Sequence, residues 1–294
     1  MAFEPPVKTP KLSWVELFTV NWTRGRLLVT TLFVVLVLGL VVVGSVSYFA
    51  IGLGPETDAL AAVEADDRIT VAWSDAGYVV YAEHTTASGT ADRFIEGTDG
   101  FVLYPGARVA PESYVPTAAA IAAERDVVVV IPHVPLNLAI LATDRADRAI
   151  ATYPGIDRWY VGGHSLGGVA ACRYAADDSD RVAGLVLFAS YCDRDLSTAE
   201  LPVLSVLATH DGVIDAEAER QARTLLPADA TLVEIEGMNH AQFGAYGPQR
   251  GDDPAGIDDR TARTHLAEAV VDWLDDRSVQ YTGGEQSQHR RPSV

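Results

Sequence analysis

The sequence predicts a doubly wound, mostly parallel α/β sheet that is preceded by one transmembrane helix. Three observations predict it: a long apolar run near the N-terminus, an alternation of short apolar strands with helix-like segments, and a glycine-rich turn between one such strand and the next helix. With 294 residues, the chain has room for one domain of about 200–250 residues and an anchor or tail. The predicted boundaries are 1–26 for a cytoplasmic segment, 27–53 for a transmembrane anchor, 54–67 for a linker, 68–278 for the α/β domain and 279–294 for a disordered tail.

The apolar run at 27–53 carries no charged side chain. A helix from Leu27 to Tyr48 would be roughly 33 Å long, slightly more than the core of a bilayer. Arg24 and Arg26 precede the run and acidic residues follow it, so we expect the N-terminus in the cytoplasm and the domain outside the cell membrane. A cleaved signal peptide and a buried core helix are the alternatives. The run is longer than the apolar region of a signal peptide, and it has no polar face.

Acidic residues dominate the charge. The chain has 40 Asp and Glu against 22 Lys and Arg, and its net charge of −18 repels the phosphates of nucleic acids, so we expect no nucleic-acid partner. The only lysines are Lys8 and Lys11. This pattern favours a halophilic protein, because salt screens the self-repulsion of carboxylates. Ordinary acidity in a genome that prefers arginine is the alternative.

Two cysteines, Cys172 and Cys192, lie in apolar segments. They are too few for a disulfide framework, and their spacing fits neither a zinc site nor a redox motif. We therefore expect two buried free thiols, with a single disulfide left open. The sequence indicates no metal and no organic cofactor.

Strands and helices alternate after the anchor. Two strands joined by a turn are expected at 68–84, and the apolar stretch 126–132 is typical of a parallel sheet that is covered on both faces. The stretch 100–108 begins as a buried strand that breaks at Pro105 and Gly106, and further strands are expected at 158–163, 182–190, 201–209 and 231–237. Helices are expected at 111–125, 166–176, 215–226 and 259–277. A loop and one more helix are expected between 132 and about residue 152. This alternation predicts the doubly wound sheet.

The stretch RWYVGGHSLGGVAACRYAA, residues 158–176, contains the glycine-rich turn. Residues 163–167 fit the pattern G-x-S-x-G between a buried strand and a helix. Such a turn holds its serine in a strained conformation at the carboxyl end of the sheet, and the flanking glycines relieve the crowding. We predict that Ser165 is a nucleophile; a serine that only caps the helix is the alternative.

A nucleophilic serine needs a base and an acid that orients the base. On this kind of sheet both follow later strands, with the acid before the histidine. Asp211 follows the second strand after Ser165, and His240 follows the last strand. Asp193 and Asp195 are rival acids in a loop rich in Asp and Arg, which is typical of a solvated loop.

The negative charge that develops on a carbonyl oxygen needs two amide donors. We expect one from Leu166, the residue after the nucleophile, and the other from Ala107 in the turn YPGARV, with Gly106 as the alternative. The stretch between Ser190 and Leu201 is too short for a lid. A shallow, open pocket is therefore expected, with a lining that includes Leu136, Asn137, Phe243 and Tyr246.

Several stretches resemble one known family: LYPGARV, GGHSLGGVAA, FASY, THDG and NHAQFGAYGPQRGDDPAGI. From about residue 99 to 277 the chain resembles the α/β-hydrolase superfamily, and within it the compact, lidless branch of dienelactone-hydrolase-like proteins. The resemblance implies Ser165 as nucleophile, Asp211 as acid and His240 as base. The turn before the first helix reads Pro-Gly, whereas His-Gly is common in the superfamily. Dienelactone hydrolases use a cysteine nucleophile, so their activity is not implied here.

From these features we expect a membrane-anchored serine hydrolase, a serine esterase that cleaves an ester or a similar acyl substrate. Its expected partners are a small-molecule acyl substrate and the lipid around the anchor; the oligomeric state is not predicted. An acyltransferase or a peptidase with the same triad, and a non-catalytic binding domain, are the alternatives.

We predict that the domain needs molar salt. From residue 54 onward the chain carries 18 Arg against 38 acidic residues, a net charge of −20. The screening length falls from about 10 Å at 0.1 M salt to about 3 Å at 1 M, so self-repulsion should weaken sharply. The midpoint of thermal unfolding, measured from 0.1 to 3 M KCl, should rise. A flat or falling midpoint would contradict the halophilic interpretation.

Overall fold

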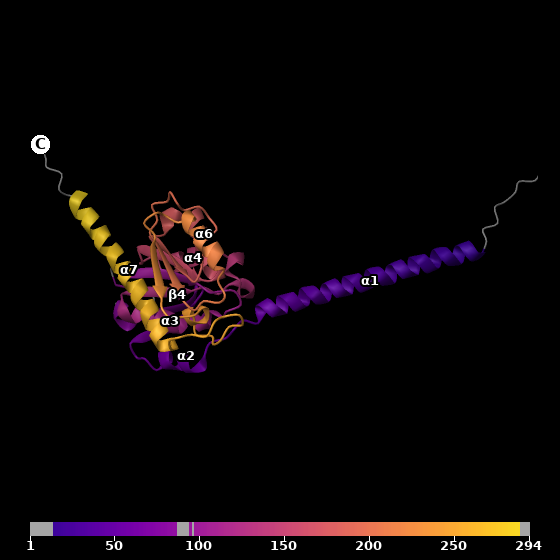
Figure 1. Cartoon of the computed structure of the whole chain (residues 1–294), viewed down its shortest axis with the longest axis horizontal. Helices are drawn as coiled ribbons and strands as arrows, with labels where there is room; N and C mark the ends of the chain where they lie inside the picture. The colour runs from indigo at the N-terminus through magenta and orange to yellow at the C-terminus, as the bar shows by residue number, and fades with distance from the viewer. Residues whose placement is uncertain (1–13, 87–93, 96, 289–294) are drawn as a thin grey trace, which may run out of the picture. The chain divides into compact units, whose positions relative to one another are not determined.

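The structure is a computed structural model that describes residues 14–86, 94–95 and 97–288. It divides into two units, Met1–Tyr48 and Phe49–Val294. Helix α1 (Trp14–Ala50; Figure 1) forms the described part of the first unit, and its last two residues, Phe49 and Ala50, are counted with the second. The second unit holds the sheet and all other elements described below.

One helix in the described part of the chain is long and apolar enough to cross a membrane. It covers Arg26–Ala50 with a mean hydropathy of 2.9, and its side chains are exposed. The predicted anchor at 27–53 ends too late, because the helix stops at Ala50. The chain from Ile51 to Leu53 leaves the helix and pairs with the second unit instead.

Among the described residues, eight strands form one sheet in the order β1-β2-β4-β3-β5-β6-β7-β8. The strands are β1 (Ile69–Ser74), β2 (Gly77–Ala82), β3 (Asp99–Tyr104), β4 (Val127–Ile131), β5 (Arg158–His164), β6 (Gly184–Phe188), β7 (Val203–Ala208) and β8 (Thr231–Ile235). Strand β2 is antiparallel to both of its neighbours, and the strands from β3 to β8 are parallel. The predicted doubly wound, mostly parallel sheet is therefore confirmed. The parallel strands all have their carboxyl ends at the same edge of the sheet. The candidate site residues lie in the segments that follow these ends.

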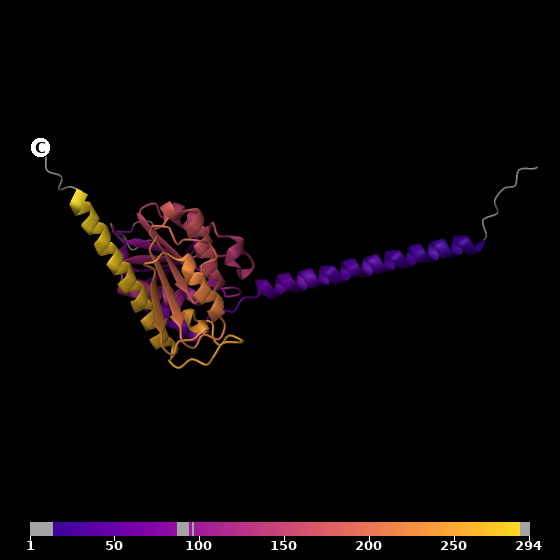
Figure 2. The ribbon, with the colours of Figure 1, turned by 45° about the horizontal axis from the view of Figure 1, so that its top comes forward.

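Helices cover both faces of the sheet, as Figure 2 shows for α7 and the helices on the opposite side. The helices are α2 (Thr57–Glu64), α3 (Val115–Glu124), α4 (Arg145–Thr152), α5 (Leu166–Asp177), α6 (Ala216–Ala222) and α7 (Asp259–Gln288). Helices α3 and α7 pack together in one apolar cluster, whereas α4 and α5 belong to a second cluster. Because helices cover both faces, β3 and β4 are buried along their length, and β4 consists of apolar residues alone.

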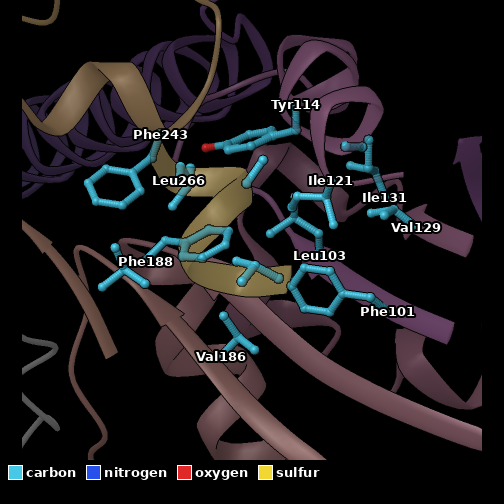
Figure 3. Packing of buried hydrophobic residues seen from close by; sticks show 14 of the residues in the cluster. Phe101, Leu103, Tyr114, Ile121, Val129, Ile131, Val186, Phe188, Phe243 and Leu266 are labelled. Atoms are coloured by element: carbon cyan, nitrogen blue, oxygen red, sulfur yellow. The ribbon is translucent and has the colours of Figure 1, made fainter. Parts of the chain in front are cut away.

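The cluster beneath α3 and α7 is built from large buried side chains (Figure 3). Phe101 and Phe188 meet edge to face at a centroid distance of 6.4 Å. Tyr114, at the start of α3, is fully buried in this cluster and directs its hydroxyl group toward the region of Phe243 (Figure 3). A phenol that is buried this deeply needs a polar partner, and it finds one in the candidate site.

The segment 54–67 is not the linker that we predicted. It contains α2, whose residues Leu60 and Val63 pack against the apolar cluster beneath α3. The amide of Glu56 also donates to the carbonyl of Ala245, at 2.8 Å. Two apolar residues three positions apart are enough to dock a short helix, but they are too few to show as a periodic pattern in a polar stretch.

The predicted disordered tail, 279–294, is wrong over most of its length. Helix α7 continues to Gln288, and residues 289–294 lie outside the described residues. The stretch VQYTGGEQSQHRRPSV is polar and holds two adjacent glycines, so its composition alone indicated disorder from residue 279.

Cys172 and Cys192 form a disulfide, so the expectation of two free thiols is wrong. Cys172 is on α5, and Cys192 is in the loop after β6. Their Cα atoms are 5.4 Å apart, within the range for disulfides. Both residues are buried, as predicted. The pairing depends on how α5 packs over β6, which the spacing of two cysteines does not reveal.

The connection between β6 and β7, residues 189–202, contains no helix or strand, and all of it is described. The prediction that no lid is inserted there is confirmed.

We expect the disulfide to stabilise the domain. The cysteines are 20 residues apart, and closing a loop of this length contributes about 3 kcal/mol in the chain-entropy model. The double variant Cys172→Ala with Cys192→Ala should lower the free energy of unfolding by about that amount, measured by denaturant titration at fixed salt. Wild-type protein under reducing conditions is the matched comparison. Unchanged midpoints in both samples would show that no bond is present.

Candidate active site

Ser165 lies in the turn between β5 and α5 with a strained backbone. Its φ is 53° and its ψ is −124°, a conformation that a residue with a side chain rarely adopts. The residue is half-buried at the carboxyl edge of the sheet. The predicted strand, sharp turn and helix are therefore present, with the serine at the turn itself.

Glycines allow the turn to be this sharp. A side chain on Gly163 would overlap the backbone of Gly167, and one on Gly167 would overlap the carbonyl groups of Tyr104 and Pro105 at the end of β3. Both glycines therefore permit approaches that no other residue could match. The second approach places the first turn of α5 directly against the turn that follows β3.

Two hydrogen bonds hold the strained serine from the neighbouring strand. The amide of Ser165 donates to the carbonyl of Phe188 at 2.9 Å. The hydroxyl of Ser190 donates to the carbonyl of Ser165 at 2.7 Å. The main chain of Ser165 is therefore fixed on both sides, which leaves its side chain as the free group of the turn. Ser190 was not singled out by the sequence, where it is the last residue of the strand expected at 182–190.

The structure brings Asp211 and His240 together from two different loops. Nδ1 of His240 lies 2.7 Å from Oδ2 of Asp211, and both side chains are almost completely buried, with 2% and 3% of their surface exposed. The other carboxylate oxygen, Oδ1, accepts from the amides of Val213 and Ile214, each at 2.8 Å. All three partners donate to an ionised carboxylate.

These bonds determine the charge of Asp211. Burial by itself raises the pKa of the carboxyl group, but the hydrogen bond from His240, the charge of His240 and the amides of Ile214 and Val213 outweigh burial and lower the pKa of Asp211 below its usual value. Asp211 is therefore ionised at neutral pH. An ionised Asp211 keeps a proton on Nδ1 of His240 and leaves the lone pair on Nε2.

The rival acids are engaged elsewhere. Asp193 forms an ion pair with Arg173 at 2.6 Å. Oδ1 of Asp195 accepts from the amide of Ser197 at 3.0 Å and from its hydroxyl at 2.6 Å, a local turn at the surface. Of the three candidate acids, only Asp211 contacts a histidine in the described structure.

No hydrogen bond joins Ser165 to His240 among the described residues. The ring of His164, the residue before Ser165, lies 4.5 Å from the ring of His240 between centroids, so His240 lies beside the turn that carries Ser165. Contacts between a nucleophile and its base are often long without substrate and tighten when it binds.

A buried chain of polar groups runs beneath His240. The amide of Gly106 donates to the hydroxyl of Tyr114 at 2.9 Å, and that hydroxyl lies 2.8 Å from Nδ1 of His164. Burial raises the pKa of Tyr114 and lowers that of His164 well below its usual value, so both are neutral. The hydroxyl already accepts from Gly106, so its own hydrogen is available to donate to Nδ1 of His164. A side chain on Gly106 would come within 2.9 Å of His164 and 3.0 Å of Tyr114, so only glycine fits.

The expected and the alternative oxyanion donors differ in whether the backbone amide is already hydrogen-bonded within the described chain. The amides of Leu166 and Ala107 donate no hydrogen bond within the described chain. The alternative, Gly106, is excluded because its amide is bonded to Tyr114. Ala107 is exposed and Leu166 is half-buried.

Two residues that we expected to line an open pocket are in the core. Phe243 is fully buried and stacks on His164 at a centroid distance of 5.4 Å. Tyr246 is 6% exposed, and its hydroxyl bonds to Gln249. The chain after His240 folds back beneath the histidine, which the sequence could not show. Leu136 and Asn137 are half-buried in the loop after β4.

Asp252 is a site residue that sequence reasoning missed. Its Oδ1 accepts from the amide of Gly212 at 3.0 Å and from that of His240 at 3.3 Å, and its Oδ2 accepts from the amide of Ala241 at 2.8 Å. This one carboxylate therefore ties the loop of Asp211 to the loop of His240. The residue lies in the stretch NHAQFGAYGPQRGDDPAGI, whose resemblance to the family gave its acidic residues no role.

The described residues contain no cluster of three or more His, Cys, Asp or Glu side chains that could hold a metal ion. The site is instead a serine on a strained turn, a histidine bonded to a carboxylate, and two unpaired amides at the same sheet edge. This set of groups suits attack on an electrophilic carbonyl group.

Two solved structures illustrate the similarity to known proteins. A predicted CIB-like hydrolase from Thermoplasma acidophilum is 13% identical with a TM-score of 0.49, and covers 71% of this chain and 98% of its own. One of the metagenome-derived lipolytic enzymes LipS and LipT is 15% identical with a TM-score of 0.41, over 49% of this chain and 86% of its own. Neither likeness bears on substrate or mechanism. No curated protein matches the sequence.

The sequence also matches the model of a protein family. The model described as the alpha/beta hydrolase family covers residues 100–264, more than half of the 294 residues. The matched part contains Ser165, Asp211 and His240. It also contains the turn of Ala107 and the strands from β4 to β8. The chain therefore belongs to the alpha/beta hydrolase family.

Proposed function

We propose that this protein is a membrane-anchored serine hydrolase that cleaves an ester or a similar acyl substrate. One observation carries the proposal: His240, bonded to Asp211 at 2.7 Å, lies beside the strained turn that presents Ser165. A structural serine would need neither the strain nor a histidine oriented by a buried carboxylate.

In the proposed reaction, Nε2 of His240 removes the proton of the Ser165 hydroxyl as its oxygen attacks the carbonyl carbon. Asp211 holds the ring in the correct tautomer and stabilises its charged form. His240 then gives that proton to the leaving alcohol, which leaves an acyl group on Ser165. Water, activated by His240, releases the acid and restores the serine. No metal or organic cofactor takes part.

We assign the stabilisation of the tetrahedral oxyanion to the amides of Leu166 and Ala107. Two unpaired amides support this assignment, and so does the contact between the first turn of α5 and the turn after β3. Gly106 takes a positioning role, since its amide is bonded to Tyr114. Through Tyr114 the same turn is connected to His164, whose ring contacts His240.

We further propose that α1 anchors the protein in the cell membrane, with the N-terminus in the cytoplasm and the domain outside. Arg26 at the start of the span and the acidic residues after it support this orientation. The disulfide between Cys172 and Cys192 supports it as well, because such bonds persist mainly in oxidising compartments.

The triad can be tested by substitution. Ser165→Ala and His240→Ala should each lower kcat by roughly 10⁴-fold or more, and Asp211→Asn should cost about as much because it favours the wrong tautomer. Asp195→Asn is the matched control and should be mild. Ester hydrolysis and labelling by a serine-directed phosphonate are the measurements. If Asp195→Asn removed activity and Asp211→Asn did not, the acid would be misassigned.

The same assays separate the alternatives. An acyltransferase would transfer the acyl group to an added alcohol in preference to water, and a peptidase would prefer amides. A binding domain would leave wild-type Ser165 unlabelled by the phosphonate.

The orientation can be tested on intact cells. Externally added protease should digest the hydrolase domain and spare residues 1–26, because the positive flank keeps the N-terminus inside. An epitope tag at each end, read by immunoblot, reports the two parts separately. Protection of the domain until the cells are lysed would reverse the topology.

A further inference from the structure

The chain that leaves α1 is hydrogen-bonded to the turn that carries Ala107. The amide of Leu53 donates to the carbonyl of Arg108 at 2.6 Å, and the amide of Ala110 donates to the carbonyl of Leu53 at 2.9 Å. Leu53 and Val109 thus pair as a parallel bridge. The segment just after α1 is therefore part of the structure that supports the candidate active site, and it is not a free tether.

Asn137 makes a second connection at the same place. Its side-chain amide donates to the carbonyls of Ala50 at 3.2 Å and Phe49 at 3.3 Å, the last residues of α1. Its own carbonyl accepts from the amide of Arg108 at 2.8 Å. A side chain on Gly52 would come within 2.9 Å of the Asn137 amide nitrogen and would displace the amide group that binds the end of α1.

This attachment limits how far the active site can be from the membrane. Only three peptide bonds separate Ala50 from Leu53, a reach of about 10 Å at most. If α1 spans the bilayer to Ala50, the turn of Ala107 lies close to the outer headgroup region at whatever angle the helix takes. Ser165 is held against that turn by the close approach of Gly167 to Pro105.

The loop after β4 has the composition of a membrane contact. Residues 127–143 contain no Asp, Glu, Lys or Arg, although the domain from residue 54 has a net charge of −20. We call residues 134–142 the apolar loop. Leu141 in this loop is 56% exposed, and Leu136, Leu138 and Ile140 are half-buried. Asn137, which binds the end of α1, is in the middle of it.

The backbone of the apolar loop is also strained. Leu136 has a φ of 55° and Asn137 a φ of 52°, and a left-handed leucine is unusual. The strain persists because Asn137 is bonded on both sides, to α1 and to Arg108. The conformation therefore fixes a short apolar segment beside the point where the anchor ends.

We propose that the apolar loop rests in the outer headgroup region and that Ser165 takes its substrate from the bilayer. The substrate class is an amphiphilic ester whose carbonyl group lies at headgroup depth. This inference rests on the proposed function: the acyl group passes to Ser165, the alcohol leaves with the proton from His240, and water releases the acid. Anionic lipids repel the acidic surface of the domain, so a segment without charged residues is the part suited to this contact.

The activity test uses the full chain in phosphatidylcholine vesicles with two esters. p-Nitrophenyl acetate reaches the site from water, and 4-methylumbelliferyl oleate is held in the bilayer. Leu141→Asp should lower hydrolysis of the oleate about tenfold, because an inserted leucine is lost, and should change the acetate rate less than twofold. Leu232→Asp is the matched control, on a 44% exposed leucine near the start of β8, and should change neither rate.

A second measurement needs no activity. Cys172 and Cys192 are paired, so Leu141→Cys and Leu232→Cys each supply a single thiol for an environment-sensitive fluorophore. In vesicles whose lipids carry a nitroxide near the headgroup, the label at residue 141 should be quenched and the label at residue 232 should not.

The two measurements separate this inference from the proposed function. Equal quenching at both positions, or an equal loss of both ester activities in Leu141→Asp, would overturn the membrane contact. Retention of acetate hydrolysis by Ser165→Ala would instead refute the proposed function and with it the substrate assignment. Selective quenching at residue 141 together with a selective loss on the oleate would support both.

Discussion

The candidate site depends on the reversal of the chain at Ser165, where a strand becomes a helix within one residue. A φ of 53° costs an L-residue about 1–3 kcal/mol, and interactions with the surrounding structure must offset this cost. They do so through the central position of β5 in the sheet and through the bonds from Phe188 and Ser190. The same packing presses α5 onto the turn after β3, so the nucleophile and the proposed amide donors are positioned together.

The sequence predicted the parts of the molecule that follow from local patterns. Apolar strands, the G-x-S-x-G turn and the order of acid and histidine were enough for the sheet and for the pairing of Asp211 with His240. What it missed depends on long-range packing. Phe243 was expected at a pocket wall and is instead beneath His164, and α2 was expected to be a linker because two half-buried residues leave no periodic signal.

Polar contacts to the backbone are the hardest to predict. Asp252 accepts hydrogen bonds from three amides of other loops, yet in the sequence it is one of 40 acidic residues. Tyr114 joins Gly106 to His164, yet in the sequence it is one aromatic residue before an expected helix. Such contacts depend on where backbone groups lie after folding, and backbone groups are the same at every position of a sequence. The disulfide is hidden for a similar reason, since α5 must first pack over β6.

The pairing of Leu53 with the turn of Ala107 also bears on whether the domain can be shed from the membrane. Many anchored ectodomains are released by a protease that cuts a solvated stalk, which requires a segment that contributes nothing to the fold. Here the chain passes from the apolar helix into the frame of the candidate site within three residues. A cut after Leu53 would remove the residue that bridges to Val109, so a domain released there would lose part of the support of its own active site.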